Sequence, residues 1–136
     1  MKNLVVTIAN LPGTLAGMAE ALAKAGINIE GICQVPWEGK VLVHMLIEDV
    51  SETRRILEGE GIKIEEEHDV LVIECKNQPG EVGRITRKVA DAGININLIY
   101  IASRNRMVLG VDDLDKTRAA LKYDPLFFKE FIKSGH

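Results

Sequence analysis

Short apolar runs along this chain alternate with segments of helical spacing. Residues 4–9 are β-branched and apolar and stop at the turn Asn10-Leu11-Pro12-Gly13, which predicts a strand. Beyond the turn, apolar residues recur every three or four positions as far as Leu22, which predicts a helix of about three turns. Gly26 follows where a left-handed C-terminal cap would lie. The first third of the chain therefore begins with a strand and an amphipathic helix.

The pattern then returns to strands. Residues 27–35 and 41–47 are apolar and β-branched, and the short polar and glycine-containing stretch between them predicts a hairpin. Asp49 or Ser51 can cap a second helix, and residues 62–65 alternate like a fourth strand. The predicted order, βαββαβ, is that of the ferredoxin-like split βαβ motif.

This unit is used twice. Residues 71–102 repeat residues 4–35 with substitutions. The Asn-x-Pro-Gly turn and a Gly-Ile-Asn-Ile motif occur in both copies, separated by the same number of residues. The second helix also recurs, so we predict two domains, residues 1–68 and 69–136. The fourth strand of the second copy would fall in the tail from about residue 123. There, Asp124 followed by Pro125 instead favours a short terminal helix, which could close an exposed sheet or dock on another protein.

The predicted fold class is α+β. Two ferredoxin-like βαββαβ units lie side by side, each an antiparallel sheet with helices on one face. The strands are apolar on both faces, and sheets of that kind are usually covered on both. We therefore expect the units to join edge to edge and a second copy of the chain to cover part of what remains, as a homodimer or a larger homo-oligomer.

Composition excludes several classes of function. The 136 residues carry a net charge of −3 with both signs interspersed, so no footprint for nucleic acid is present. No apolar run approaches the roughly 20 residues that span a membrane, and the default location is cytoplasmic. Cys33 and Cys75 lack CxxC spacing and are interpreted as core thiols.

Catalytic and metal chemistry are not indicated. The histidines, at positions 44, 68 and 136, are scattered, and no acid, base and nucleophile set can be named. We therefore expect a protein that is not an enzyme and needs no cofactor or metal. The acidic residues 65–69 are interpreted as a solvated link between the units.

The Asn-x-Pro-Gly turn is the place where binding chemistry is expected. A helix start leaves about four backbone N–H groups without partners and carries partial positive charge, which suits a carboxylate. Asn10 and Asn28, like Asn77 and Asn95 in the second copy, end or begin strands expected to be neighbours, and their amides suit an α-ammonium group. The alternative is structural, because both motifs are also ordinary turn and helix-cap chemistry.

Together these motifs resemble the ACT domain, a small regulatory module that binds amino acids in many metabolic enzymes. The resemblance covers two copies and leaves only the tail unmatched. It implies a ligand at the interface between paired modules, against the Pro-Gly loop of one and the first strands of its neighbour. The implied residues are Asn10, Leu11, Pro12, Gly13, Thr14 and Asn28, and Asn77, Gln78, Pro79, Gly80, Glu81 and Asn95.

The chain also departs from the family. Some serine-binding members carry a histidine two residues before the loop asparagine, where this chain has Ile8 and Cys75. In the second copy, Glu81 would repel a bound carboxylate, whereas Arg84 could attract one. The loop of the first copy is therefore the better candidate site.

Two functions are compatible with the sequence. The first is a non-catalytic regulatory sensor that binds a small amino acid and signals to a partner metabolic enzyme or regulator. The second is a ligand-free interaction module, in which the apolar sheet faces and the Phe-rich tail assemble with an enzyme subunit.

Overall fold

The computed structural model describes residues 1–122 and residue 124. It divides into two compact units, Met1–Asp69 and Val70–His136, called here the first and second unit. The predicted terminal helix, which would begin at Pro125, lies outside the described residues.

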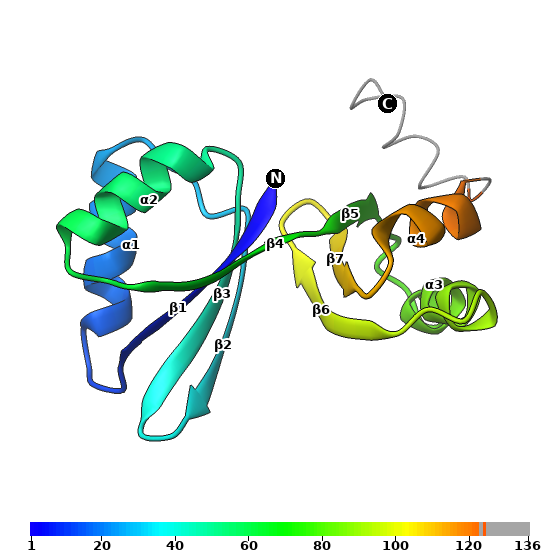
Figure 1. Cartoon of the computed structure of the whole chain (residues 1–136), viewed down its shortest axis with the longest axis horizontal. Coiled ribbons are helices and arrows are strands. Elements are labelled where there is room, and N and C mark those ends of the chain that lie inside the picture. Colours follow the sequence, from blue (N-terminus) through cyan, green and yellow to red (C-terminus); the bar gives the residue numbers. More distant parts are fainter. Residues whose placement is uncertain (123, 125–136) are drawn as a thin grey trace. The chain divides into compact units, whose positions relative to one another are not determined.

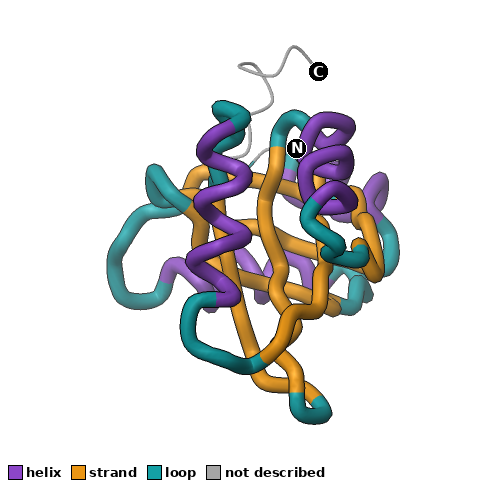
Figure 2. The backbone as a smooth tube through the Cα atoms, turned by 90° about the vertical axis from the view of Figure 1, so that its left-hand side faces the viewer, coloured by secondary structure: helices purple, strands orange, loops and turns teal. Residues whose placement is uncertain are grey.

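The first unit is a four-stranded antiparallel sheet with two helices on one face (Figure 1). The strand order is β2-β3-β1-β4, so both hairpin strands lie to one side of β1. Figure 2 looks onto the helical face of this unit, with the two helices in front of the strands. Its elements are β1 (Lys2–Ala9), α1 (Thr14–Lys24), β2 (Gly31–Trp37), β3 (Lys40–Ile47), α2 (Val50–Gly59) and β4 (Ile64–Asp69).

The period of two along β1 places every second side chain under the helices. Leu4, Val6 and Ile8 belong to one apolar core with Leu22 of α1 and Leu57 of α2. Asp49 caps α2, because its carboxylate accepts the Glu52 N–H at 3.1 Å. Burial of this aliphatic cluster is the main force that holds the helices against the sheet.

The second unit repeats this plan with a three-stranded antiparallel sheet of order β5-β7-β6 in its described part. Its core gathers Ile73, Ile85, Val89 and Leu121, all fully buried. Asp113 caps α4 as Asp49 caps α2, here accepting the Lys116 N–H at 2.9 Å. The elements are β5 (Leu71–Glu74), α3 (Glu81–Asp91), β6 (Ile96–Ala102), β7 (Arg106–Val111) and α4 (Leu114–Leu121).

The predicted fold class is confirmed, with differences at element boundaries. The first hairpin strand begins at Gly31 rather than at residue 27. The interpretation of residues 65–69 as a solvated link is wrong, because they belong to β4 and pair with β1. Glu67 and Asp69 also face Lys2, at 3.1 and 3.5 Å from its Nζ. The predicted fourth strand, at residues 62–65, therefore lies a few residues later, at Ile64–Asp69. A charged strand at a sheet edge is a common protection against pairing with other chains, and its polarity hid its full extent in the sequence.

None of the helices in the described part of the chain is long and apolar enough to cross a membrane.

Candidate functional site

The turn of the first unit connects β1 to α1 and leaves the start of the helix open. The Leu11 N–H donates to the Ala9 carbonyl at 2.9 Å, which closes the turn on itself. Gly13 is the N-cap of α1 with a φ of 91°, in the left-handed region that favours glycine. No side chain caps the helix at this position. The Thr14 N–H donates to the Leu11 carbonyl at 3.4 Å, which leaves the next N–H groups of the first turn for an external acceptor.

Thr14 fixes the shape of this turn. Its hydroxyl lies 2.7 Å from the Ala9 carbonyl oxygen and 3.0 Å from that of Leu11, and it donates to these two acceptors. The hydroxyl is therefore directed at the backbone of the turn and does not cap the helix. Asn10, Leu11 and Pro12 are exposed, with Leu11 retaining 66% of its accessible surface. An exposed leucine beside free N–H groups gives the turn both an apolar and a polar contact for a ligand.

A cavity of about 390 Å³ adjoins the start of α1. Gly13, Thr14 and Gly17 line it from the turn and the helix, and Thr7 lines it from β1. Glu60 and Ile62, which follow α2, line the other side. The cavity is large enough for a small organic molecule, and two glycines let such a molecule approach the backbone closely.

The second unit has the same turn, and its helix α3 likewise has no side-chain cap, but a buried carboxylate of the chain lies in this turn. Gly80 is the N-cap of α3 with a φ of 89°, which matches Gly13. The next residue, Glu81, is 4% exposed, and it accepts the Lys76 N–H at 2.7 Å and the Arg84 Nε–H at 2.6 Å. The Arg84 guanidinium, and after it the Lys76 N–H, lower the pKa of the Glu81 carboxyl. This turn already contains an anion, and that anion belongs to the protein.

Arg84 is also engaged, so the expectation that it attracts the carboxylate of a ligand needs correction. Its guanidinium bonds to the carboxylate of Asp124, which is 1% exposed, as well as to Glu81. The Lys88 Nζ lies 2.8 Å from the same Asp124 carboxylate. The carboxylates that Arg84 attracts are therefore those of this chain. The sequence predicted Asp124 only as the start of a terminal helix, because nothing local links it to Arg84 or Lys88.

Asn28 and Asn95 do not lie beside the turn of their own unit. β3 separates β1 from β2, and β7 separates β5 from β6. Because each intervening strand is antiparallel to both neighbours, the two strands beside it run in the same direction. The end of β1 and the start of β2, like the end of β5 and the start of β6, therefore lie at opposite ends of the strands. The expectation that Asn10 and Asn28 end or begin neighbouring strands was therefore wrong. Asn28 instead donates to Glu30, and the Asn95 amide donates to Asn97 at 2.9 Å.

Two histidines that are far apart in the sequence share one amide. The Asn3 Nδ2 lies 3.1 Å from His44 Nδ1 and 3.4 Å from His68 Nδ1. Burial, and then the neighbouring His68, lower the pKa of His44. Across residues 1–122 and 124, no group of three or more His, Cys, Asp or Glu side chains is placed to hold a metal ion.

The two N-cap glycines permit a matched test of the turns. Alanine at position 13 or 80 is expected to cost about 1–2 kcal/mol in either unit, because a Cβ would meet nothing within 4 Å and only the left-handed backbone is strained. The free energy of unfolding from urea titration measures this cost. Equal losses are expected, and a loss at Gly13 alone would contradict the equivalence of the two turns.

Part of the chain matches a known protein family. Residues 70–123 match the family model of the ACT domain, so the chain contains one such domain in its second unit. Comparison with curated protein sequences gave no match.

Solved structures extend the similarity to nearly the whole chain. Protein BT0572 from Bacteroides thetaiotaomicron superposes with a TM-score of 0.80 at 24% identity, covering 92% of this chain and 88% of that one. The ligand-free regulatory subunit of aspartate kinase from Thermus thermophilus gives a TM-score of 0.66 at 23% identity, covering 89% and 87%. At these identities the likeness concerns the fold. It covers both units, whereas the family model covers one.

Proposed function

We propose that this protein is a regulatory sensor that binds a small amino acid at the Asn10–Thr14 turn. The observation that carries the proposal is the contrast between the two turns. In the first, the start of α1 has no side-chain cap and adjoins a cavity. In the second, the buried Glu81 carboxylate accepts the nearby Lys76 N–H. A ligand carboxylate would supply in the first unit the negative charge that Glu81 supplies in the second.

Each group of an amino acid has a partner in this arrangement. Its carboxylate would accept from the N–H groups at the start of α1, and its ammonium would donate to the side-chain oxygen of Asn10. The exposed Leu11 would contact the ligand's side chain, and Gly13 permits close approach to the backbone. Asn28 of an adjoining ACT unit would complete the site, as the family resemblance implies.

The first unit is, in this proposal, a second ACT domain. It shares with the second unit the left-handed glycine N-cap and the aspartate-capped second helix. The corresponding positions of the second turn, Asn77, Gln78, Pro79, Gly80 and Glu81 with Asn95, form the weaker candidate site. A homodimer or larger assembly would pair such units, and a partner metabolic enzyme or regulator would receive the signal without catalysis by this chain.

Asparagine 10 gives the direct test. A thermal-shift screen against the standard amino acids is expected to show a dose-dependent rise in Tm with one or a few of them, because a ligand that prefers the native state stabilises it. Asn10→Ala should weaken the apparent affinity about tenfold, since it removes one charge-assisted hydrogen bond, and should leave the Tm without ligand nearly unchanged. Asn77→Ala is the matched control and should retain the response. Retained affinity in Asn10→Ala would contradict the site.

A ligand-free interaction module is the second candidate function. The observation that favours it is the edge strand β2, on which Ile32, Val35 and Trp37 keep 42%, 42% and 59% of their accessible surface. Exposed apolar residues along a sheet edge are typical of surfaces that bind other chains. Absence of any amino-acid response at millimolar concentrations would favour this function over the sensor.

A further inference from the structure

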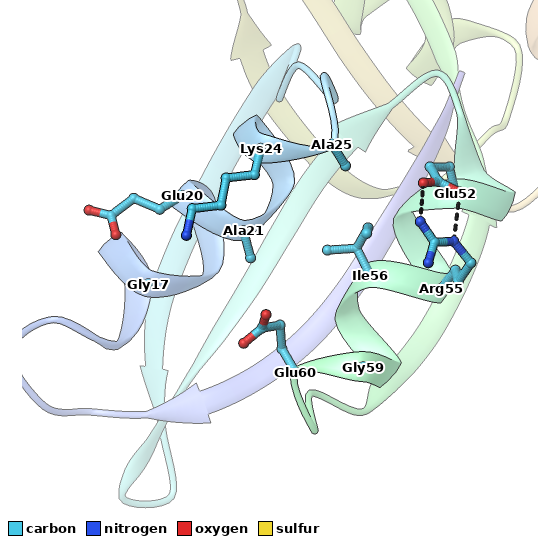
Figure 3. Close-up of a pocket in the computed structure, with 10 residues that line it drawn as sticks. All are labelled: Gly17, Glu20, Ala21, Lys24, Ala25, Glu52, Arg55, Ile56, Gly59 and Glu60. Carbon is cyan, nitrogen blue, oxygen red and sulfur yellow. Dashed lines mark hydrogen bonds and ion pairs between the residues drawn. The ribbon is translucent and has the colours of Figure 1, made fainter.

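A second cavity of the first unit, of about 570 Å³, lies between α1 and α2 (Figure 3). It adjoins the cavity beside the Asn10–Thr14 turn, with which it shares Gly17 and Glu60, but no residue of the turn itself lines it. Small residues of α1 form one wall, among them Gly17 and Ala21, and Ile56 and Gly59 of α2 form the other. Glu60 follows α2 at the end of this groove, and Figure 3 shows its carboxylate directed into the space between the helices. The groove therefore has unfilled space with a carboxylate directed into it.

The second unit shows what occupies the equivalent place. The repeat that aligns the two turns also aligns Gly17 with Arg84 and Ala21 with Lys88. The repeat of the second helix aligns Glu60 with Asp124. The backbone supports this pairing, because the Glu60 N–H bonds to the Leu57 carbonyl at 3.1 Å and the Asp124 N–H bonds to the Leu121 carbonyl at 2.9 Å.

In the second unit, then, two cations on the first helix neutralise an acid that follows the second helix. Arg84 and Lys88 both bond to the buried Asp124 carboxylate. The first unit keeps the acid but has glycine and alanine in place of the cations. In the described structure, neither the side-chain carboxylate of Glu60 nor that of Glu20, an acid of α1 in the groove, forms a hydrogen bond or ion pair.

The charges of the groove favour a cation. Glu52 and Arg55 neutralise each other, with Arg55 Nε 2.9 Å from the Glu52 carboxylate. The other charged residues that line the groove are one cation, Lys24, and two acids, Glu20 and Glu60. The groove therefore carries one excess negative charge. Figure 3 shows the Lys24 ammonium at the rim of the groove, where no ion pair joins it to either acid.

We propose that this groove is a docking site for a basic side chain of a partner polypeptide, an arginine or a lysine, whose cationic end pairs with Glu60. The second unit provides the template, in which long basic side chains bring guanidinium and ammonium groups to the equivalent acid. The groove is open to solvent, and an exposed ion pair changes an equilibrium constant only about fivefold or less. A free amine would therefore gain little, whereas a side chain of a larger partner gains the remaining affinity from the surface around it.

Supplying the cation within the chain tests the groove first. Ala21→Lys introduces the residue of the second unit and is expected to raise the Tm by about 1–4 °C relative to Ala21→Met, which adds a neutral chain of similar length. The gain should vanish in a Glu60→Gln background and persist in Glu58→Gln, an exposed acid of α2 that does not line the groove. No gain over Ala21→Met, or a gain independent of Glu60, would overturn the proposal.

A soluble probe tests recognition from outside the chain. N-acetyl-L-arginine amide should shift the amide resonances of Ala21, Gly59 and Glu60 in a saturable, millimolar titration that N-acetyl-L-citrulline amide, its neutral analogue, does not reproduce. Glu60→Gln should weaken this binding about fivefold. Equal shifts with both compounds would overturn the proposal, as would free arginine binding tenfold more tightly, because the site would then serve a free amino acid.

Lys24 is the competing occupant. If its ammonium filled the groove in solution, Lys24→Met would lower the Tm of the wild type and have no effect in Glu60→Gln. That result would overturn the proposal, whereas an unchanged Tm together with tighter binding of the arginine probe would support it.

Discussion

Leu57→Ala is expected to lower the free energy of unfolding of the first unit by about 2–5 kcal/mol, the largest loss among the substitutions considered. Leu57 is fully buried where α2 meets the sheet, in the core that includes Leu22 and Val6. The loss combines the transfer free energy of the deleted atoms with the cost of the cavity left behind. It should be near the upper end of the range, because β-branched neighbours on the strand have few alternative rotamers with which to fill the cavity.

Leu121→Ala is the matched substitution in the second unit. Leu121 occupies the corresponding position of α4 and is equally buried, but it belongs to a separate apolar cluster. Amide hydrogen exchange, measured together with urea unfolding, should show that each substitution lowers protection against exchange mainly among the residues of its own cluster. Leu11→Ala, at an exposed position, should change stability by no more than about 0.5 kcal/mol. A loss below 1 kcal/mol for Leu57→Ala would mean that the helix does not depend on this contact.

The alternation of apolar residues made the fold class predictable from the sequence. In each unit, the aliphatic side chains lie on one face of the helices and strands, at the helical and strand periods seen in the sequence. Gly13 and Gly80 form the same helix N-cap in the two units. The strand β4 was predicted at residues 62–65 but extends from Ile64 to Asp69, because Glu65, Glu66 and Glu67 obscure its alternation. Its place in the sheet depends on pairing with β1, which no local pattern encodes.

The candidate site was predictable only where it is local. The Asn10–Gly13 turn could be read directly, since proline and glycine fix its backbone. Asn28 could not be placed, because its position depends on which strand lies between β1 and β2. The charges around Arg84 were equally hidden, since the ion pair with Asp124 joins residues 40 positions apart in the sequence. Long-range pairing decides such contacts, and they become visible only in the three-dimensional structure.

Glu81→Ala should lower the free energy of unfolding of the second unit by about 2–3 kcal/mol. The carboxylate is 4% exposed and holds two donors, the Lys76 N–H and Arg84, and a hydrogen bond to a charged group contributes about 1.5–3 kcal/mol. Arg84 keeps Asp124 and is partly exposed, so solvent and that acid offset part of the loss. Asp115→Asn, at a fully exposed carboxylate of the same unit, should be nearly neutral.

The pH dependence of a second substitution at this position, Glu81→Gln, distinguishes a charged contact from simple packing. Because the folded pKa of Glu81 lies below its ordinary value of 4.5, the stabilisation is fully present above that value and is lost as the pH falls through the folded pKa. The difference between wild type and Glu81→Gln, measured by urea unfolding, should therefore shrink on acidification below about pH 4.5. A difference that stays constant across this range would mean that Glu81 acts through its size and not through its charge. The second turn would then lack the internal anion, and its contrast with the open turn at Asn10 would no longer support an amino-acid site in the first unit alone.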